Sequence, residues 1–198
     1  MILKAINVTK KFGELKAVND LSFEVQQGQI FGIAGPNGAG KSTVYNLITG
    51  FHSYEGVIEF EGRNISGLPP YRIAKAGIAR TFQIPQTFPS LTVKKSISVG
   101  SRFGAAGGLD PDHVDEVIRF GDLEKERFQN TGMLTLLGKK KLMIGASLAT
   151  KPKLMMLDEP MAGCNANEIR SLMDLIARIN QELGVTIIII EHFMKVLT

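Results

Sequence analysis

Residues 35–42 have the glycine spacing and the side chains that proteins use to hold phosphate groups. They read Gly-Pro-Asn-Gly-Ala-Gly-Lys-Ser and match the pattern G-x-x-x-x-G-K-[ST]. The glycines allow backbone N–H groups to curl around phosphate oxygens, while Lys41 neutralises the β- and γ-phosphates and the Ser42 hydroxyl ligates Mg²⁺. A glycine-rich turn with a solvated lysine is the alternative. The full pattern predicts a nucleotide polyphosphate site formed by Gly35, Pro36, Asn37, Gly38, Ala39, Gly40, Lys41, Ser42 and Thr43.

Two adjacent carboxylates end a second stretch that could do chemistry. The apolar residues 154–157 run directly into Asp158 and Glu159. At the end of a buried strand, Asp158 can hold Mg²⁺ through water, and Glu159 can polarise an attacking water as general base. Taken alone, this pattern fits a strand that runs into a polar turn equally well. Together with the phosphate motif, it predicts a site that hydrolyses a nucleotide.

The elements around these residues alternate between strands and helices. Apolar residues at helical spacing follow the phosphate motif at 42–49, and two continuous apolar runs flank a long amphipathic segment at 165–183. The predicted strands are 2–8, 21–25, 29–34, 57–60, 154–157 and 185–190. This alternation predicts the α/β class, with a mainly parallel sheet covered by helices and an antiparallel β portion at the N-terminus.

The middle of the chain, from about residue 90 to 134, has a different character. Strand-type apolar runs give way to helical segments, which alternate with the glycine-rich stretch 104–108. We interpret this region as a helical subdomain inserted into the core. The predicted division of a single domain over 1–198 is a core lobe at about 1–86 and 142–198 and a helical subdomain at about 87–141.

Composition limits the classes of protein to which the chain can belong. Its 198 residues are 44% hydrophobic and 21% charged, which is typical of a globular domain. The net charge of +4 is spread among acids along the chain, so it is weak support for a nucleic-acid partner. The basic run Lys139, Lys140 and Lys141 is interpreted as a solvated helix start, with an anion-facing role as the alternative. The single cysteine, Cys164, favours a reducing, cytosolic setting.

With both motifs in place, the chain resembles the nucleotide-binding domains of ABC transporters along nearly its whole length. The resemblance implies ATP and Mg²⁺ as cofactors. Phe12 falls where the family has an aromatic that stacks on adenine, although a core aromatic is the alternative. Gln83 resembles the glutamine that contacts Mg²⁺ or the lytic water, and His192 resembles the switch histidine at the γ-phosphate. The implied catalytic residues are Glu159, Gln83 and His192, and the implied metal ligands are Ser42, Gln83 and Asp158.

One stretch departs from the family pattern. Where the family usually has Leu-Ser-Gly-Gly-Gln, residues 134–138 read Leu-Thr-Leu-Leu-Gly. In the family this stretch faces the ATP of a second subunit, so the resemblance implies a homo- or heterodimer with ATP sandwiched between the subunits. Thr135 retains a hydroxyl and Gly138 a flexible turn, and both are expected at that nucleotide. The leucine in place of a glycine makes an unequal pair with a related second ATPase plausible.

Residues 67–83 resemble, more narrowly, the ATPases of branched-chain amino acid importers. This implies ATP-driven import through transmembrane permease subunits, with an extracytoplasmic solute-binding protein acting indirectly. The subunit would be peripheral on the cytoplasmic face of the membrane, because no stretch approaches 18 apolar residues. A permease helix is expected to dock on residues 84–93 and the helices beyond, although Phe88 and Leu91 are alternatively core residues. Family domains continue further than Thr198 does here, so we expect the chain to be incomplete at its C-terminus.

Two other functions stay open from the sequence. A soluble ABC-type ATPase acting on nucleic acid or ribosomes is one, although such proteins commonly carry two domains or long coiled-coil insertions. A nucleotide-binding regulatory module that does not hydrolyse ATP is the other, and the unusual residues 134–138 fit it. The motor of a transporter, without a nucleic-acid partner, is the function that we expect.

Overall fold

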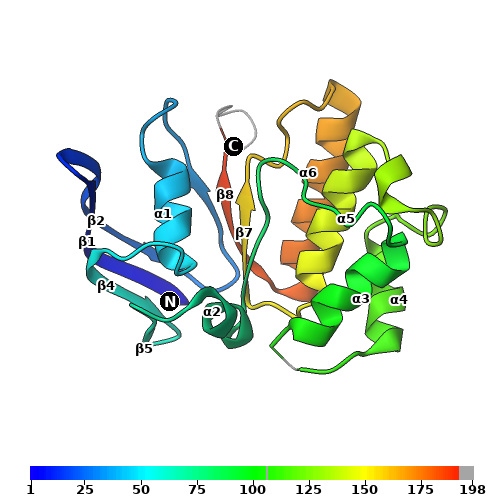
Figure 1. Ribbon diagram of the computed structural model, residues 1–198, viewed down its shortest axis with the longest axis horizontal. Coiled ribbons are helices and arrows are strands. Elements are labelled where there is room, and N and C mark those ends of the chain that lie inside the picture. Colours follow the sequence, from blue (N-terminus) through cyan, green and yellow to red (C-terminus); the bar gives the residue numbers. More distant parts are fainter. Residues whose placement is uncertain (106, 192–198) are drawn as a thin grey trace.

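Two β-sheets form the framework of the computed structural model, which describes residues 1–105 and 107–191. Figure 1 shows the antiparallel strands at one end, the parallel strands in the middle and a layer of helices at the other end. The predicted α/β class, with a parallel sheet and an antiparallel portion at the N-terminus, is therefore confirmed.

The first sheet is antiparallel. Its order is β2 (Leu15–Val25), β1 (Leu3–Phe12), β4 (Glu55–Phe60) and β5 (Arg63–Asn64). The central strand is β1, in which Leu3 pairs with Val25 on one side and with Phe60 on the other. These three side chains are buried, so this end of the sheet turns its apolar face to the core.

The second sheet is parallel. Its order is β3 (Ile30–Ile33), β8 (Thr186–Ile190), β7 (Leu154–Asp158) and β6 (Ile78–Arg80). Every residue of β7 and β8 is buried, as expected for parallel strands covered on both faces. Ile190 pairs with Ile33 on one side and with Asp158 on the other, so the carboxyl ends of these strands meet at one edge of the sheet.

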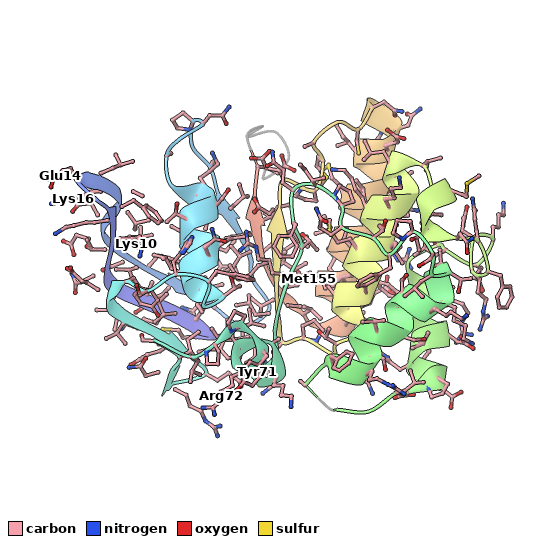
Figure 2. All side chains as sticks on the ribbon, in the orientation of Figure 1. Lys10, Glu14, Lys16, Tyr71, Arg72 and Met155 are labelled. Carbon is pink, nitrogen blue, oxygen red and sulfur yellow. The ribbon has the colours of Figure 1, made fainter. Side chains whose placement is uncertain are left out.

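Helices cover both faces of the parallel sheet. Helices α1 (Lys41–Ile48) and α2 (Pro70–Ala76) lie toward the antiparallel sheet, whereas α5 (Leu136–Leu148) and α6 (Ala166–Leu183) lie on the other side of β7 and β8 (Figure 1). Side chains of β7 alternate between the two sides. Met156 joins the apolar cluster of α1, and Met155, which Figure 2 places near the middle of the molecule, joins that of α5 and α6.

The central region of the chain is helical, as predicted. It contains α3 (Val93–Phe103), α4 (Pro111–Phe120) and a short 3₁₀ turn (Thr131–Met133), and both longer helices begin with a side-chain cap. Helices α3 and α4 share one apolar cluster with α5, α6 and β7. The division into a core lobe and a separate helical subdomain stays a prediction.

Candidate nucleotide site

The phosphate motif forms the loop between β3 and α1. Gly38 and Gly40 have φ angles of 80° and 85°, in the left-handed region that glycine adopts without strain. Gly40 also lies against β2, because a Cβ at this position would stand only 2.3 Å from the carbonyl oxygen of Ala17. The close approach of the loop to β2 therefore requires a glycine at position 40.

Lys41 is the first residue of α1 and is only 8% exposed. Its ammonium donates hydrogen bonds to the carbonyl oxygens of Gly35, at 2.7 Å, and Pro36, at 2.9 Å. The side chain therefore curls back over the loop. A phosphate oxygen held by the loop could replace either carbonyl as the partner of this ammonium.

Tyr45, one turn further along α1, links the helix to the parallel sheet through hydrogen bonds of its hydroxyl. The side chain is fully buried, and its hydroxyl lies 2.7 Å from the carbonyl oxygen of Ile188 and 3.0 Å from that of Leu157. Burial, together with the nearby charge of Asp158, raises the pKa of Tyr45 well above its usual value. The neutral hydroxyl thus holds α1 against the strand that ends in Asp158, a role that the sequence analysis missed.

Asp158 ends β7, with a side chain that is 5% exposed. Its Oδ2 accepts a hydrogen bond from Nη2 of Arg80 at 3.1 Å, whereas its Oδ1 is buried without a hydrogen-bond partner among the described residues. Burial raises the pKa of Asp158, and the Arg80 guanidinium opposes this rise. The structure therefore leaves one carboxylate oxygen for another ligand.

A magnesium ion fits this donor set. Mg²⁺ prefers oxygen ligands and is usually bound through one or two carboxylates, substrate phosphates and water. Over residues 1–105 and 107–191, no three His, Cys, Asp or Glu side chains lie together as an all-protein metal site. The orphaned Oδ1 of Asp158 is the kind of ligand that such a shared site uses.

Glu159 and Gln83 are brought together although they are 76 positions apart in sequence. Nε2 of Gln83 donates a hydrogen bond to Oε2 of Glu159 at 2.8 Å. Glu159 has a φ of 46°, which is uncommon for a residue with a side chain, and its N–H donates to the carbonyl of Ile190 at 3.1 Å. The turn after β7 thus fixes the backbone of Glu159. The side chain of Gln83 orients the Glu159 carboxylate. His192 lies outside the described residues.

The prediction of a solvated basic run is wrong for Lys140 and Lys141, which are 2% and 9% exposed. Nζ of Lys140 donates to the carbonyl of Pro160 at 2.7 Å and lies 3.5 Å from that of Glu159, while Lys141 pairs with Asp122 at 3.2 Å. Burial lowers the pKa of Lys140. Its ammonium is buried because the turn after β7 covers α5 and offers carbonyl oxygens. Lys140 therefore ties α5 to the turn that carries Glu159.

Arg80 is a site residue that sequence reasoning missed. It ends β6, where its side chain contacts Asp158, Asn46 and Thr49. Residues 78–80 are not among the strands predicted from sequence, so the position of Arg80 at the edge where the parallel strands end could not be foreseen.

Phe12 lies at the outer part of the antiparallel sheet. It ends β1 and is 45% exposed, with its ring edge-on to that of His52 at 5.4 Å between centroids, so the core-aromatic alternative is wrong. Figure 2 shows Glu14 and Lys16 at the tip of this sheet and Lys10 further along it. A stacking role for Phe12 stays a prediction.

Thr135 and Gly138 form the beginning of α5. Oγ1 of Thr135 accepts a hydrogen bond from the N–H of Gly138 at 3.1 Å and so caps the helix. Because α5 and α1 lie on opposite sides of β7 and β8, this cap does not join the phosphate loop within the chain (Figure 1). The contact of these residues with the nucleotide of a second subunit stays a prediction.

No helix within the described ranges combines the length and the apolar character needed to cross a bilayer.

Comparison with known proteins identifies the family. A family model described as "ABC transporter" matches residues 18–162. The high-affinity branched-chain amino acid transport ATP-binding proteins BraF of Pseudomonas aeruginosa and LivG of Salmonella typhimurium are 34% and 36% identical, over 98% of this chain and 83% of each relative. A crystal structure of the ADP conformation of an ATP-binding cassette of an ABC transporter has a TM-score of 0.89 and 31% identity, over 99% of this chain and 83% of its own. Since the match spans most of its length, the chain belongs to the ABC transporter family.

Proposed function

We propose that this chain is the ATP-hydrolysing subunit of an importer for branched-chain or related amino acids. The hydrogen bond of 2.8 Å between Gln83 and Glu159 carries the hydrolytic part of the proposal. It holds a candidate general base in place directly after Asp158, at the same edge of the sheet as the phosphate loop. The relatives BraF and LivG are transport ATP-binding proteins, which supports the class of solute.

The residues divide the chemistry between phosphate binding and water activation. Backbone N–H groups of residues 35–42 and the Lys41 ammonium hold the β- and γ-phosphates. Ser42, Gln83 and Asp158 would hold Mg²⁺, which, when bound, neutralises negative charge on the phosphate oxygens. Glu159 accepts a hydrogen bond from the attacking water and polarises it. His192 would contact the γ-phosphate, as the family resemblance implies.

A groove beside this site supports the docking of a permease helix. It has a volume of about 480 Å³ and lies between α2 and β6 on one side and α3 and α5 on the other. Its lining is mostly apolar and includes Ile73, Phe82, Phe88 and Leu142. Phe88 is 55% exposed, so the alternative of a core position is wrong for this residue. Apolar surface gathered in one groove is typical of a site that a partner covers.

A second ATP-binding subunit would complete the assembly. In this arrangement two ATP molecules lie between the subunits, and their binding energy closes the pair and moves the permeases. Leu136 is 40% exposed at the beginning of α5, where the family usually has a glycine, and this favours an unequal pair. The subunit would lie on the cytoplasmic face of the membrane, and a solute-binding protein outside would deliver the amino acid.

Purification from membranes tests the proposal. We expect the chain to co-purify with permease subunits, and the reconstituted complex to hydrolyse ATP and to take up labelled leucine. Glu159→Gln should bind ATP but lower the hydrolysis rate by a factor of about 10² to 10⁴, the usual contribution of a general base. Glu182→Gln, at an exposed position on α6, is the matched control and should keep the wild-type rate. Equal rates for wild type and Glu159→Gln would contradict the assigned base.

A further inference from the structure

Arg80 occupies a position that is expensive for a cation. Its side chain is only 9% exposed, and its Nε is buried without a hydrogen-bond partner among the described residues. Burying an arginine costs free energy unless its donors are paired, and one donor of Arg80 is unpaired among the described residues. The unfavourable burial of Arg80 therefore indicates a role in the function of the site.

The guanidinium joins three elements of the nucleotide site. Nη2 contacts Oδ2 of Asp158 at 3.1 Å, and Nη1 donates to Oδ1 of Asn46 at 2.6 Å and reaches Oγ1 of Thr49 at 3.3 Å. Asn46 belongs to α1, and Thr49 is the residue directly after the end of this helix. The helix that begins with Lys41 therefore anchors the guanidinium. Through Arg80, α1 fixes one oxygen of Asp158, and the buried Oδ1 is left for the metal.

The same side chain belongs to the wall of the groove. Arg80 and Phe82 both line it, and the guanidinium carbon of Arg80 lies 5.0 Å from the centre of the Phe82 ring. On the inner side, it lies 5.5 Å from the ring of the buried Tyr45. The ring of Phe82 is 42% exposed, so a partner in the groove can press on it and thereby on Arg80.

We infer that Arg80 is a positioning residue for the magnesium site, which orients Asp158 and links that carboxylate to the groove through Phe82. This inference rests on the proposed function, because it assumes that Asp158 holds Mg²⁺ beside a bound nucleotide. Arg80 does not touch the nucleotide phosphates in this role. It acts through Asp158, as outer-sphere partners of metal ligands do.

Magnesium titrations of nucleotide binding test the inference without any turnover. The affinity of the full chain for a non-hydrolysable ATP analogue is measured by calorimetry, first in EDTA and then at rising Mg²⁺ concentrations. Arg80→Lys retains the charge but replaces the guanidinium fork that spans Asp158 and Asn46 by a single ammonium. We expect its affinity in EDTA to match that of wild type, because the phosphate loop is intact. The Mg²⁺ concentration at half-effect should rise about tenfold, as loss of an outer-sphere partner usually causes.

Two further variants separate positioning from folding. Asn46→Ala removes one anchor of the guanidinium but leaves Arg80 itself, and we expect a smaller shift in the same direction. Phe82→Ala removes the ring that lines the groove and lies against the Arg80 guanidinium, and we expect it to move the Mg²⁺ midpoint severalfold although Phe82 does not contact Asp158. Arg102→Lys, at an exposed position near the end of α3, is the matched control and should leave the midpoint unchanged.

The outcomes are distinguishable. An unchanged midpoint in folded Arg80→Lys, or in Asn46→Ala if Arg80→Lys does not fold, would overturn the positioning role. An unchanged midpoint in Phe82→Ala would overturn the link to the groove. If wild type itself showed no effect of Mg²⁺ on nucleotide affinity, the proposed function would fail first.

Discussion

Replacing Tyr45 by phenylalanine removes one oxygen atom from the interior while keeping the ring in place. The lost hydroxyl lies 2.7 Å and 3.0 Å from two buried strand carbonyls, so no water replaces it easily. Removing one partner of a buried hydrogen bond costs about 1–3 kcal/mol. For a chain of 198 residues, each kcal/mol lowers the melting temperature by about 2–4 °C. The variant should therefore melt about 2–12 °C below wild type.

Thermal unfolding followed by circular dichroism measures the shift in melting temperature, and urea unfolding measures the loss of unfolding free energy of about 1–3 kcal/mol. Tyr71→Phe is the matched control, because Tyr71 is 61% exposed on α2 (Figure 2) and its loss should change the free energy of unfolding by less than about 0.5 kcal/mol. A Tyr45→Phe variant as stable as Tyr71→Phe would refute the reasoning that α1 is held to the sheet through this hydroxyl.

The pH dependence gives a second check on Tyr45. Its pKa is raised in the folded protein above the unfolded value of about 10, so its contribution to stability is complete below that pH and is lost as the pH rises further. Tyr45→Phe lacks this loss. The difference in unfolding free energy between wild type and variant should therefore narrow above pH about 10, and a gap that widened there would contradict the assigned burial.

Two glycines and two lysines provide further paired predictions. Gly38→Ala should lower the unfolding free energy by about 1–2 kcal/mol through its φ of 80° alone. Gly40→Ala adds a contact of 2.3 Å with the carbonyl oxygen of Ala17, so it should lower the unfolding free energy clearly more and abolish ATP binding. Equal effects of the two variants in urea unfolding and calorimetry would contradict the close approach of the loop to β2. Lys140→Met should lower the unfolding free energy by about 1–3 kcal/mol and slow ATP hydrolysis, because a buried carbonyl of Pro160 loses its donor, whereas Lys139→Met should change stability by less than about 0.5 kcal/mol. Equal unfolding free energies for the two lysine variants would contradict the claim that Lys140 holds α5 to the turn after β7.

The elements best predicted from sequence are those whose pattern depends on local geometry. The strands at 154–157 and 185–190 are continuous apolar runs because parallel strands are covered on both faces, and β7 and β8 fall on them. The amphipathic segment predicted at 165–183 forms α6, and the side chain of Asn165 caps it by accepting hydrogen bonds from two N–H groups at its beginning. Strand β2 was harder, because it begins at Leu15 and passes through Asp20, which has a φ of 51° beside an irregular register.

The parts of the site that escaped prediction depend on contacts between distant segments. Arg80 meets Asp158 from 78 positions away, and Lys140 meets Pro160 from 20 positions away. Neither pairing has a spacing rule in the sequence. The burial of Lys140 shows the difficulty, because a lysine near a helix start is usually solvated and only the fold reveals the carbonyl oxygens that it reaches.

The decisive measurement is calorimetric titration of the folded full chain with ATP in the presence of Mg²⁺. We expect tight, magnesium-dependent binding by wild type and by Glu159→Gln, and no measurable binding by Lys41→Ala, because the ammonium now held by Gly35 and Pro36 is the partner of the β- and γ-phosphates. Folded wild-type protein that bound neither ATP nor ADP, or Lys41→Ala protein that bound as tightly as wild type, would contradict the assignment of residues 35–43 as the nucleotide site.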